Sequence, residues 1–79
     1  MNYDSFISAI QDDYNDASFR LNGKDVHIEP IVKNSNTKYL LIIDGTENLY
    51  SSLDALMSDA RFNGHSIKDY YSSLSINLY

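Results

Sequence analysis

The sequence contains no cysteine among its 79 residues. That absence excludes disulfide bonds, thiolate nucleophiles and cysteine-ligated zinc. Basic residues are also scarce, with 6 lysines and arginines against 11 aspartates and glutamates, so the formal net charge is -5. A protein of this charge repels the phosphates of nucleic acids and is attracted to basic surfaces. We therefore expect no direct contact with nucleic acid.

Long hydrophobic runs are missing as well. No apolar stretch approaches the length of a membrane span, and the N-terminus does not place a basic segment before an apolar one. We therefore expect a cytoplasmic protein with no membrane partner. A chain of this length allows one domain, which we place over residues 1–79.

Residues for catalysis or metal binding do not converge in a recognised pattern. His27 shares a predicted strand face with Glu29, but a zinc site needs a further ligand there, and His65 follows a glycine in a predicted turn. No histidine is placed to activate a serine, and the three glycines are isolated rather than gathered in a phosphate-binding loop. We predict a protein that is not an enzyme and that holds no metal ion or cofactor.

The dipeptide Asn22-Gly23 gives the clearest structural signal. A two-residue Asn-Gly loop between alternating runs predicts a β-hairpin, because both turn residues must adopt positive φ. This turn places Phe19 opposite Val26 and Leu21 opposite Lys24, so Phe19, Leu21 and Val26 share one face.

Two further strand segments follow the first turn. Residues 33–37 are polar and predict a looser second turn, and the apolar run 39–43 predicts a third strand that is buried on both faces. Pro30 cannot donate to a strand ladder, so we expect an edge position or a bulge there. Residues 75–79 alternate polar and apolar side chains, which suits either a short strand or a packed tail.

Three other segments have the spacing of amphipathic helices. Together with the strands they predict an α+β fold of one helix, a three-stranded antiparallel meander sheet and two helices (αβββαα), with the helices on one face of the sheet. Ser66 and Asp69 form a predicted capping box at the start of the last helix. The apolar stripes are Tyr3, Phe6, Ile7, Ile10 and Tyr14, then Leu49, Leu53, Leu56, Met57 and Ala60, then Ile67, Tyr70, Tyr71 and Leu74.

Acidic residues are crowded into two segments without a neighbouring base. Asp12 and Asp13 fall at the predicted C-terminal end of the first helix, where the helix dipole disfavours negative charge. Such a placement indicates that these carboxylates serve binding rather than stability. The alternative is that they are solvated surface charges that keep a small protein soluble. The two segments are residues 1–16, with Asp4, Asp12, Asp13 and Asp16, and residues 44–59, with Asp44, Glu47, Asp54 and Asp59.

The order of elements and several stretches resemble small phage-encoded anti-CRISPR proteins that inhibit type II-A Cas9, of the Listeria prophage type. The similar stretches are Met1-Asn2, Phe19 to Gly23, Val32 to Tyr39, Leu53 to Gly64, Tyr70-Tyr71 and Ser75 to Leu78. The resemblance implies an inhibitor that imitates the charge of DNA and occupies the cleft where Cas9 reads the duplex. In the family the second turn carries acidic residues, whereas here residues 34–38 contain none.

Charge crowding and the resemblance together give a predicted partner-binding set. We expect the partner to be a basic nucleic-acid-binding protein, namely Cas9 with its guide RNA in a bacterial host cell, bound by a monomer or a weak dimer. A small acidic immunity or antitoxin-like protein that neutralises a nuclease is the alternative. One negative patch would form if the first helix and the turn after the third strand lie at the same edge of the sheet. The predicted residues are Asp12, Asp13, Asp16, Asn34, Ser35, Asn36, Asp44, Glu47 and Asp69.

Overall fold

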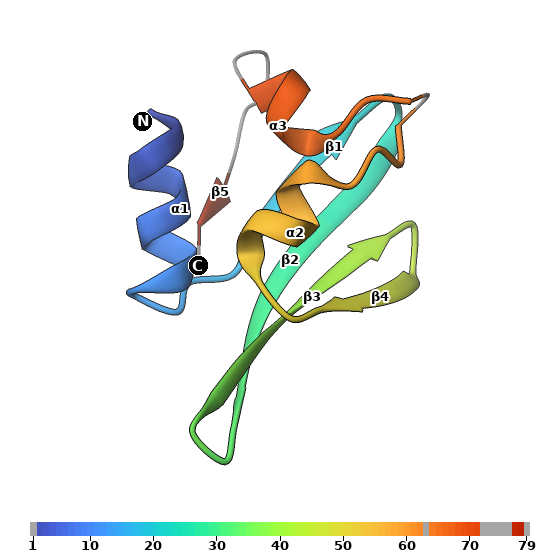
Figure 1. The fold of residues 1–79 in the computed structure, drawn as a ribbon. Coiled ribbons are helices and arrows are strands. Elements are labelled where there is room, and N and C mark those ends of the chain that lie inside the picture. The colour runs from blue at the N-terminus through green and yellow to red at the C-terminus, as the bar shows by residue number, and fades with distance from the viewer. Residues whose placement is uncertain (1, 63, 72–76, 79) are drawn as a thin grey trace.

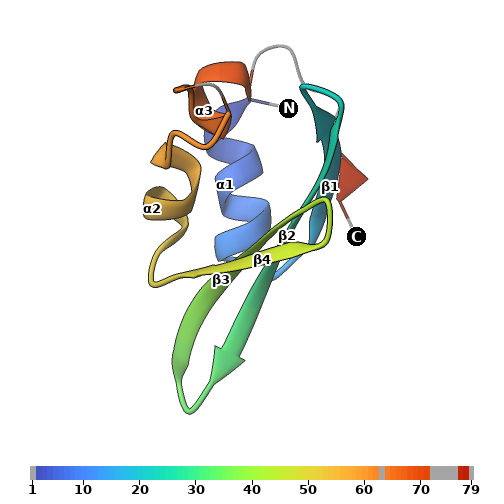
Figure 2. The ribbon, with the colours of Figure 1, turned by 90° about the vertical axis from the view of Figure 1, so that its right-hand side faces the viewer.

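The computed structural model describes residues 2–62, 64–71 and 77–78 and has the α+β architecture. An antiparallel sheet has the strand order β4-β3-β2-β1-β5, and the helices α1, α2 and α3 lie on one face of it (Figures 1 and 2). None of the helices in the described ranges is long and apolar enough to cross a membrane.

Three two-residue turns join the first four strands into a meander. The strands are β1 (Ala17–Leu21), β2 (Lys24–Lys33), β3 (Asn36–Ile43) and β4 (Thr46–Tyr50). Both residues of every turn have positive φ, which ranges from 47° at Asp44 to 86° at Gly45. Turns of this kind match the right-handed twist of the strands they join, and they fix the register of each hairpin.

The predicted register of the first hairpin is confirmed, with Phe19 opposite Val26 and Leu21 opposite Lys24. The prediction of a loose second turn is wrong, because Lys33 pairs directly with Asn36 and only two residues lie between them. A serine, Ser35, adopts a φ of 66° there, although serine is less suited to this conformation than glycine.

The prediction of three strands is wrong, because β4 occupies a segment that we assigned to the second helix. Asp44-Gly45 belongs to the same class of turn dipeptide as Asn22-Gly23, and it returns the chain so that Thr46 pairs with Ile43. The helix α2 (Leu53–Ser58) starts only after Ser52, whose hydroxyl accepts a hydrogen bond from the Ala55 N–H. Sheet pairing therefore overrides the helical spacing of the apolar residues.

Pro30 lies within β2, the middle strand of the five, and yet it breaks no ladder. The pairing of β2 with β1 ends at Ile28, whereas its pairing with β3 continues to Lys33. In an antiparallel pair, successive backbone N–H groups point alternately toward one neighbouring strand and the other. The Pro30 nitrogen points away from β3, toward the side of β1, and β1 does not extend that far. The strand is a local edge at this point, as the proline predicted.

The helix α1 (Tyr3–Gln11) packs on the sheet through Phe6, Ala9 and Ile10. Its cap is Asn2, whose Oδ1 accepts a hydrogen bond of 2.8 Å from the Ser5 N–H. Tyr14, which we placed on the same apolar stripe, lies beyond the helix with a φ of 56° and is 54% exposed. The helix ends before that position, so the side chain does not reach the core.

The C-terminal part of the chain adds a short helix and a short strand. The predicted capping box is confirmed, since Ser66 and Asp69 exchange hydrogen bonds at the start of α3 (Ile67–Tyr70). The short strand β5 (Asn77–Leu78) pairs with β1, so the tail adds a fifth strand. Leu74, which we placed on the last helical stripe, lies outside the described residues.

Candidate partner-binding surface

The sheet has two unlike faces. The helices cover the first face (Figure 2), where the side chains of Ile28 and Leu41 are at most 1% exposed. No helix of the described ranges covers the second, which we call the outer face. The strand register places a row of four directly paired residues, one on each of four strands, on the outer face. These residues are Ser18, His27, Ile42 and Glu47.

Apolar side chains remain uncovered on the outer face. Leu40 and Ile42 of β3 are half-buried, and their neighbour on β4, Leu49, is 54% exposed. We interpreted the apolar run of β3 as a strand buried on both faces, and this prediction is wrong for the outer face. The apolar run of β3 is nevertheless the feature of the sequence that could have indicated this surface. Apolar residues that face outward on an uncovered sheet are typical of an interaction site.

Three carboxylates share the outer face with these apolar residues. Asp16 and Glu29 are half-buried beside His27, and Glu47 is exposed on β4. Glu47 lies two strand spacings from His27, which is about 10 Å. Within the described part of the chain, no lysine or arginine forms an ion pair with these three carboxylates. We call Asp16, Glu29 and Glu47 the outer-face acidic cluster.

His27 holds the centre of this cluster. Its Nε2 lies 3.6 Å from an Asp16 oxygen and 4.0 Å from a Glu29 oxygen, and its Nδ1 lies 2.7 Å from the Ser18 hydroxyl. The sequence pairs His27 with Glu29 two residues along the same strand, but it offered no third group. Asp16 is that group, because the chain enters β1 directly opposite this part of β2.

Two of the predicted site residues have roles within the fold. Asp44 accepts a hydrogen bond of 2.8 Å from the Asp25 N–H, which fastens the β3–β4 turn to the start of β2. Asp69 accepts a hydrogen bond from the Ser66 N–H, and this bond lowers the pKa of its carboxyl. Neither carboxylate needs a partner protein to explain its position.

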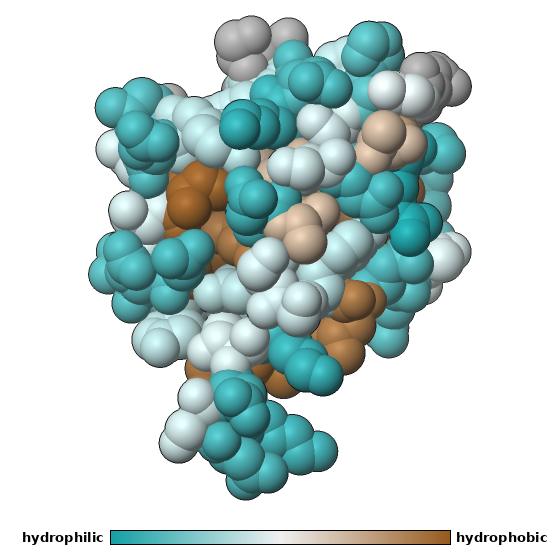
Figure 3. Space-filling model, viewed as in Figure 1, coloured by the Kyte–Doolittle hydropathy of each residue, from teal (hydrophilic) through white to brown (hydrophobic). Residues whose placement is uncertain are grey.

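The other predicted residues are spread over separate places. Asp12 and Asp13 are exposed at the C-terminal end of α1, and residues 34–36 form the tip of the β2–β3 hairpin, which projects beyond the sheet (Figure 1). This tip is hydrophilic in Figure 3, as is most of the helix-bearing side.

The predicted acids do not form one patch, because the first helix and the turn after β3 do not lie at the same edge of the sheet. The β3–β4 turn lies at the same end of the sheet as the β1–β2 turn, because the Asp25 N–H donates a hydrogen bond to Asp44. Asp16 precedes β1 and therefore lies at the opposite end of that strand. Asp44 is thus separated from Asp12, Asp13 and Asp16, while Glu47 shares the outer face with Asp16.

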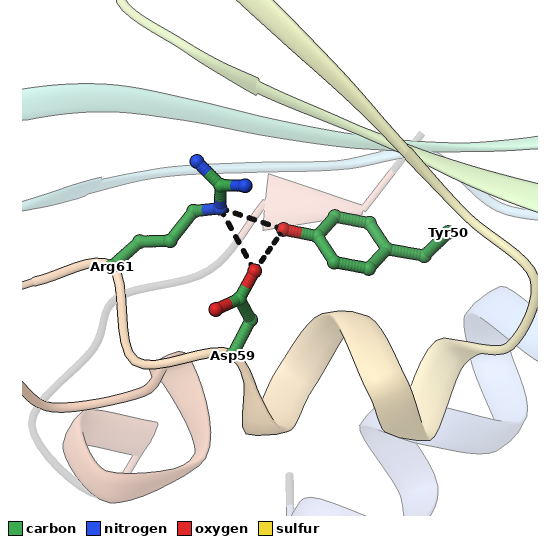
Figure 4. Close-up of polar contacts among 3 residues, drawn as sticks. All are labelled: Tyr50, Asp59 and Arg61. Carbon is green, nitrogen blue, oxygen red and sulfur yellow. Dashed lines mark hydrogen bonds and ion pairs between the residues drawn. The ribbon is translucent and has the colours of Figure 1, made fainter.

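A polar triad joins β4 to the end of α2 (Figure 4). The Tyr50 hydroxyl donates a hydrogen bond of 2.5 Å to Asp59, and the Arg61 Nε donates to both the Tyr50 oxygen (2.7 Å) and Asp59 (2.9 Å). The Tyr50 hydroxyl, followed by Arg61, holds the pKa of the Asp59 carboxyl below its ordinary value. These contacts hold the segment after α2 against the sheet.

A depression of about 280 Å³ adjoins this triad. Its wall carries both signs of charge, so it gives neither an anion nor a cation a clear preference. The lining residues are Lys24, Ile43, Asp44, Thr46, Asn48 and Arg61.

Substituting Tyr50 by phenylalanine should lower the free energy of unfolding by about 1–2 kcal/mol, because the two hydrogen bonds of its hydroxyl are lost. The difference from the parent protein should be full above about pH 5, about one unit above the ordinary pKa of an aspartate. It should shrink as the pH falls through the lowered pKa of Asp59, because a protonated carboxyl is a weaker acceptor. Urea denaturation over the range from about pH 6 to about pH 2 measures both effects, and a difference that stays undiminished over the whole range would contradict this role of Asp59.

Comparison with protein-family models, with curated protein sequences and with solved structures gave no match for this chain. Its functional interpretation therefore comes from the chemistry of its own surface. The outer face of the sheet combines charge with exposed apolar area, and no helix of the described ranges covers it.

Proposed function

We propose that this protein is an acidic inhibitor that binds type II-A Cas9 and prevents it from engaging target DNA. The observation that carries the proposal is the outer-face acidic cluster on the same face as the partly exposed Leu40, Ile42 and Leu49, in a protein with a net charge of -5. Carboxylates on such a face complement the arginines and lysines with which a DNA-binding protein contacts phosphates. The inhibitor would act by occupying that surface.

The mixture of residues on the outer face suits a protein partner better than a small ligand. Leu49 and the edges of Leu40 and Ile42 supply apolar area that water leaves on association. Glu47, beside them, supplies charge that accelerates the encounter with a basic partner. A surface of this kind binds through contact area and electrostatic steering.

The sequence resemblance supports Cas9 as the partner rather than another basic protein. In the resembled family, acidic side chains enter the cleft where Cas9 reads the short duplex motif beside its target. Here the hairpin tip, residues 34–36, contains no carboxylate, so the proposed contact uses the outer face instead. The mechanism requires no reaction, because arginines that are held by carboxylates are not available to bases or phosphates.

Adding the protein to Cas9 loaded with guide RNA should abolish binding of a labelled target duplex. The loss should saturate near one inhibitor per Cas9, or two if the chain dimerises, because the inhibitor acts by occupancy. Its association should slow as salt rises from about 0.05 M to about 0.2 M, since exposed charges are then screened. Titration in a gel-shift assay, with association rates from biolayer interferometry, measures both.

Inactivation of many Cas9 molecules by one inhibitor molecule would contradict occupancy and indicate catalysis. Unchanged DNA binding by Cas9, together with tight binding to a nuclease toxin, would instead favour the immunity-protein alternative. A matched control is Cas9 already loaded with target DNA. The inhibitor should not bind this complex, because the basic surface that it needs is then covered.

A further inference from the structure

We propose that Asp16, His27 and Glu29 bind one Zn²⁺ ion on the outer face of the sheet. The ligand atoms of these three residues all lie within 4.8 Å of one another. The group brings together one imidazole and two carboxylates, a ligand set that suits zinc. No partner protein is needed to assemble it.

The ligand atoms lie slightly farther apart than in a formed tetrahedral site. Zinc bonds of about 2.0–2.2 Å to nitrogen and oxygen place neighbouring ligand atoms about 3.4 Å apart. The Nε2 of His27 lies 3.6 Å from the Asp16 oxygen and 4.0 Å from the Glu29 oxygen. Small side-chain rotations would close the remaining gap, and water would supply the fourth ligand.

The second nitrogen of His27 also has a partner that could fix the ring. Its Nδ1 lies 2.7 Å from the Ser18 hydroxyl. When Nδ1 carries the proton and donates it to Ser18, the lone pair of Nε2 faces the two carboxylates. Metal-binding histidines characteristically donate their other ring N–H to a neighbouring group, which fixes the ring and its tautomer.

Two carboxylates that face each other repel, and a cation between them relieves that repulsion. No lysine or arginine of the described residues forms an ion pair with Asp16 or Glu29, so the fold supplies no permanent cation there. The side chains of Asp16, His27 and Glu29 are 34%, 31% and 42% exposed, so an ion can reach them from solvent. Metal titration tests whether an ion occupies this group.

Calorimetric titration of the purified chain with Zn²⁺ should show about one saturable site, and His27→Gln should weaken zinc affinity by at least about tenfold. His65→Gln is the matched control, because His65 lies 3.7 Å from one carboxylate, Asp69, and has no second one within reach among the described residues. It should leave the affinity unchanged. Both substituted side chains are on the surface, so circular dichroism should show parent-like folding.

Ser18→Ala tests the positioning role of the hydroxyl. It should weaken zinc affinity by about tenfold while the melting temperature without metal stays close to that of the parent. The NMR signals of the His27 ring should shift on zinc addition, and Mg²⁺ should not reproduce the shift, because magnesium prefers oxygen ligands. Absence of a saturable zinc site, or an affinity that His27→Gln leaves unchanged, would overturn the proposal. These measurements need no Cas9, so their outcome does not depend on whether the protein inhibits Cas9.

Discussion

Replacing Leu41 by alanine should lower the free energy of unfolding by about 2–5 kcal/mol. Leu41 is 1% exposed on β3 and belongs to the core that the sheet forms with Phe6, Ile28 and Leu56. Truncation removes buried apolar surface and leaves a cavity that the neighbouring strands cannot close without losing their register. A chain of this length has a total stability of roughly 4–12 kcal/mol, so the variant should lose a large part of it.

Leu49→Ala is the matched control for this prediction. Leu49 lies on the neighbouring strand but on the outer face, and it is 54% exposed. Its substitution should change the free energy of unfolding by no more than about 1 kcal/mol. Urea denaturation with an unchanged slope measures both variants. Equal losses for Leu41→Ala and Leu49→Ala would show that the outer face is buried in solution, for example by a second copy of the chain.

Local sequence chemistry predicted the parts of the fold that local chemistry controls. Asn22-Gly23 determined a hairpin and its register, and Ser66 with Asp69 determined a helix start, because each signal acts over a few residues. Asp44-Gly45 carried a comparable signal, but the helical spacing of Leu49 and the residues after it competed with it. Pairing of this segment with β3 favours the strand. A short stretch of sequence does not show such pairing, because it depends on a neighbouring strand.

The candidate site was less predictable, because it depends on contacts between distant segments. Glu47 was selected for its charge, and it does lie on the outer face. The link after α1 brings Asp16 beside His27, which lies on a different strand. Asp44 was selected for its charge as well, yet its carboxylate holds a turn. Charge in a sequence indicates which residues can bind a partner, whereas the hydrogen bonds of the fold decide which remain available.

The largest effect on partner binding should come from Glu47→Lys. Glu47 is exposed on the outer face and forms no ion pair among the described residues, so its charge is available to a basic partner. Reversal replaces an attraction by a repulsion on the β4 side of the proposed contact. We expect association with Cas9 to slow by at least about tenfold at low salt, and by less at high salt. Thermal stability should change little, because the residue is exposed.

Two further reversals decide whether the outer face is the contact. Asp12→Lys with Asp13→Lys reverses exposed charge at the end of α1, and Asp54→Lys reverses it on α2. Both should slow association less than Glu47→Lys, since they alter the overall charge but not the outer face. Glu47 is not a ligand of the proposed zinc site, so the comparison is independent of metal. If the double reversal slows association while Glu47→Lys does not, the end of α1 is the binding surface and the outer face is not.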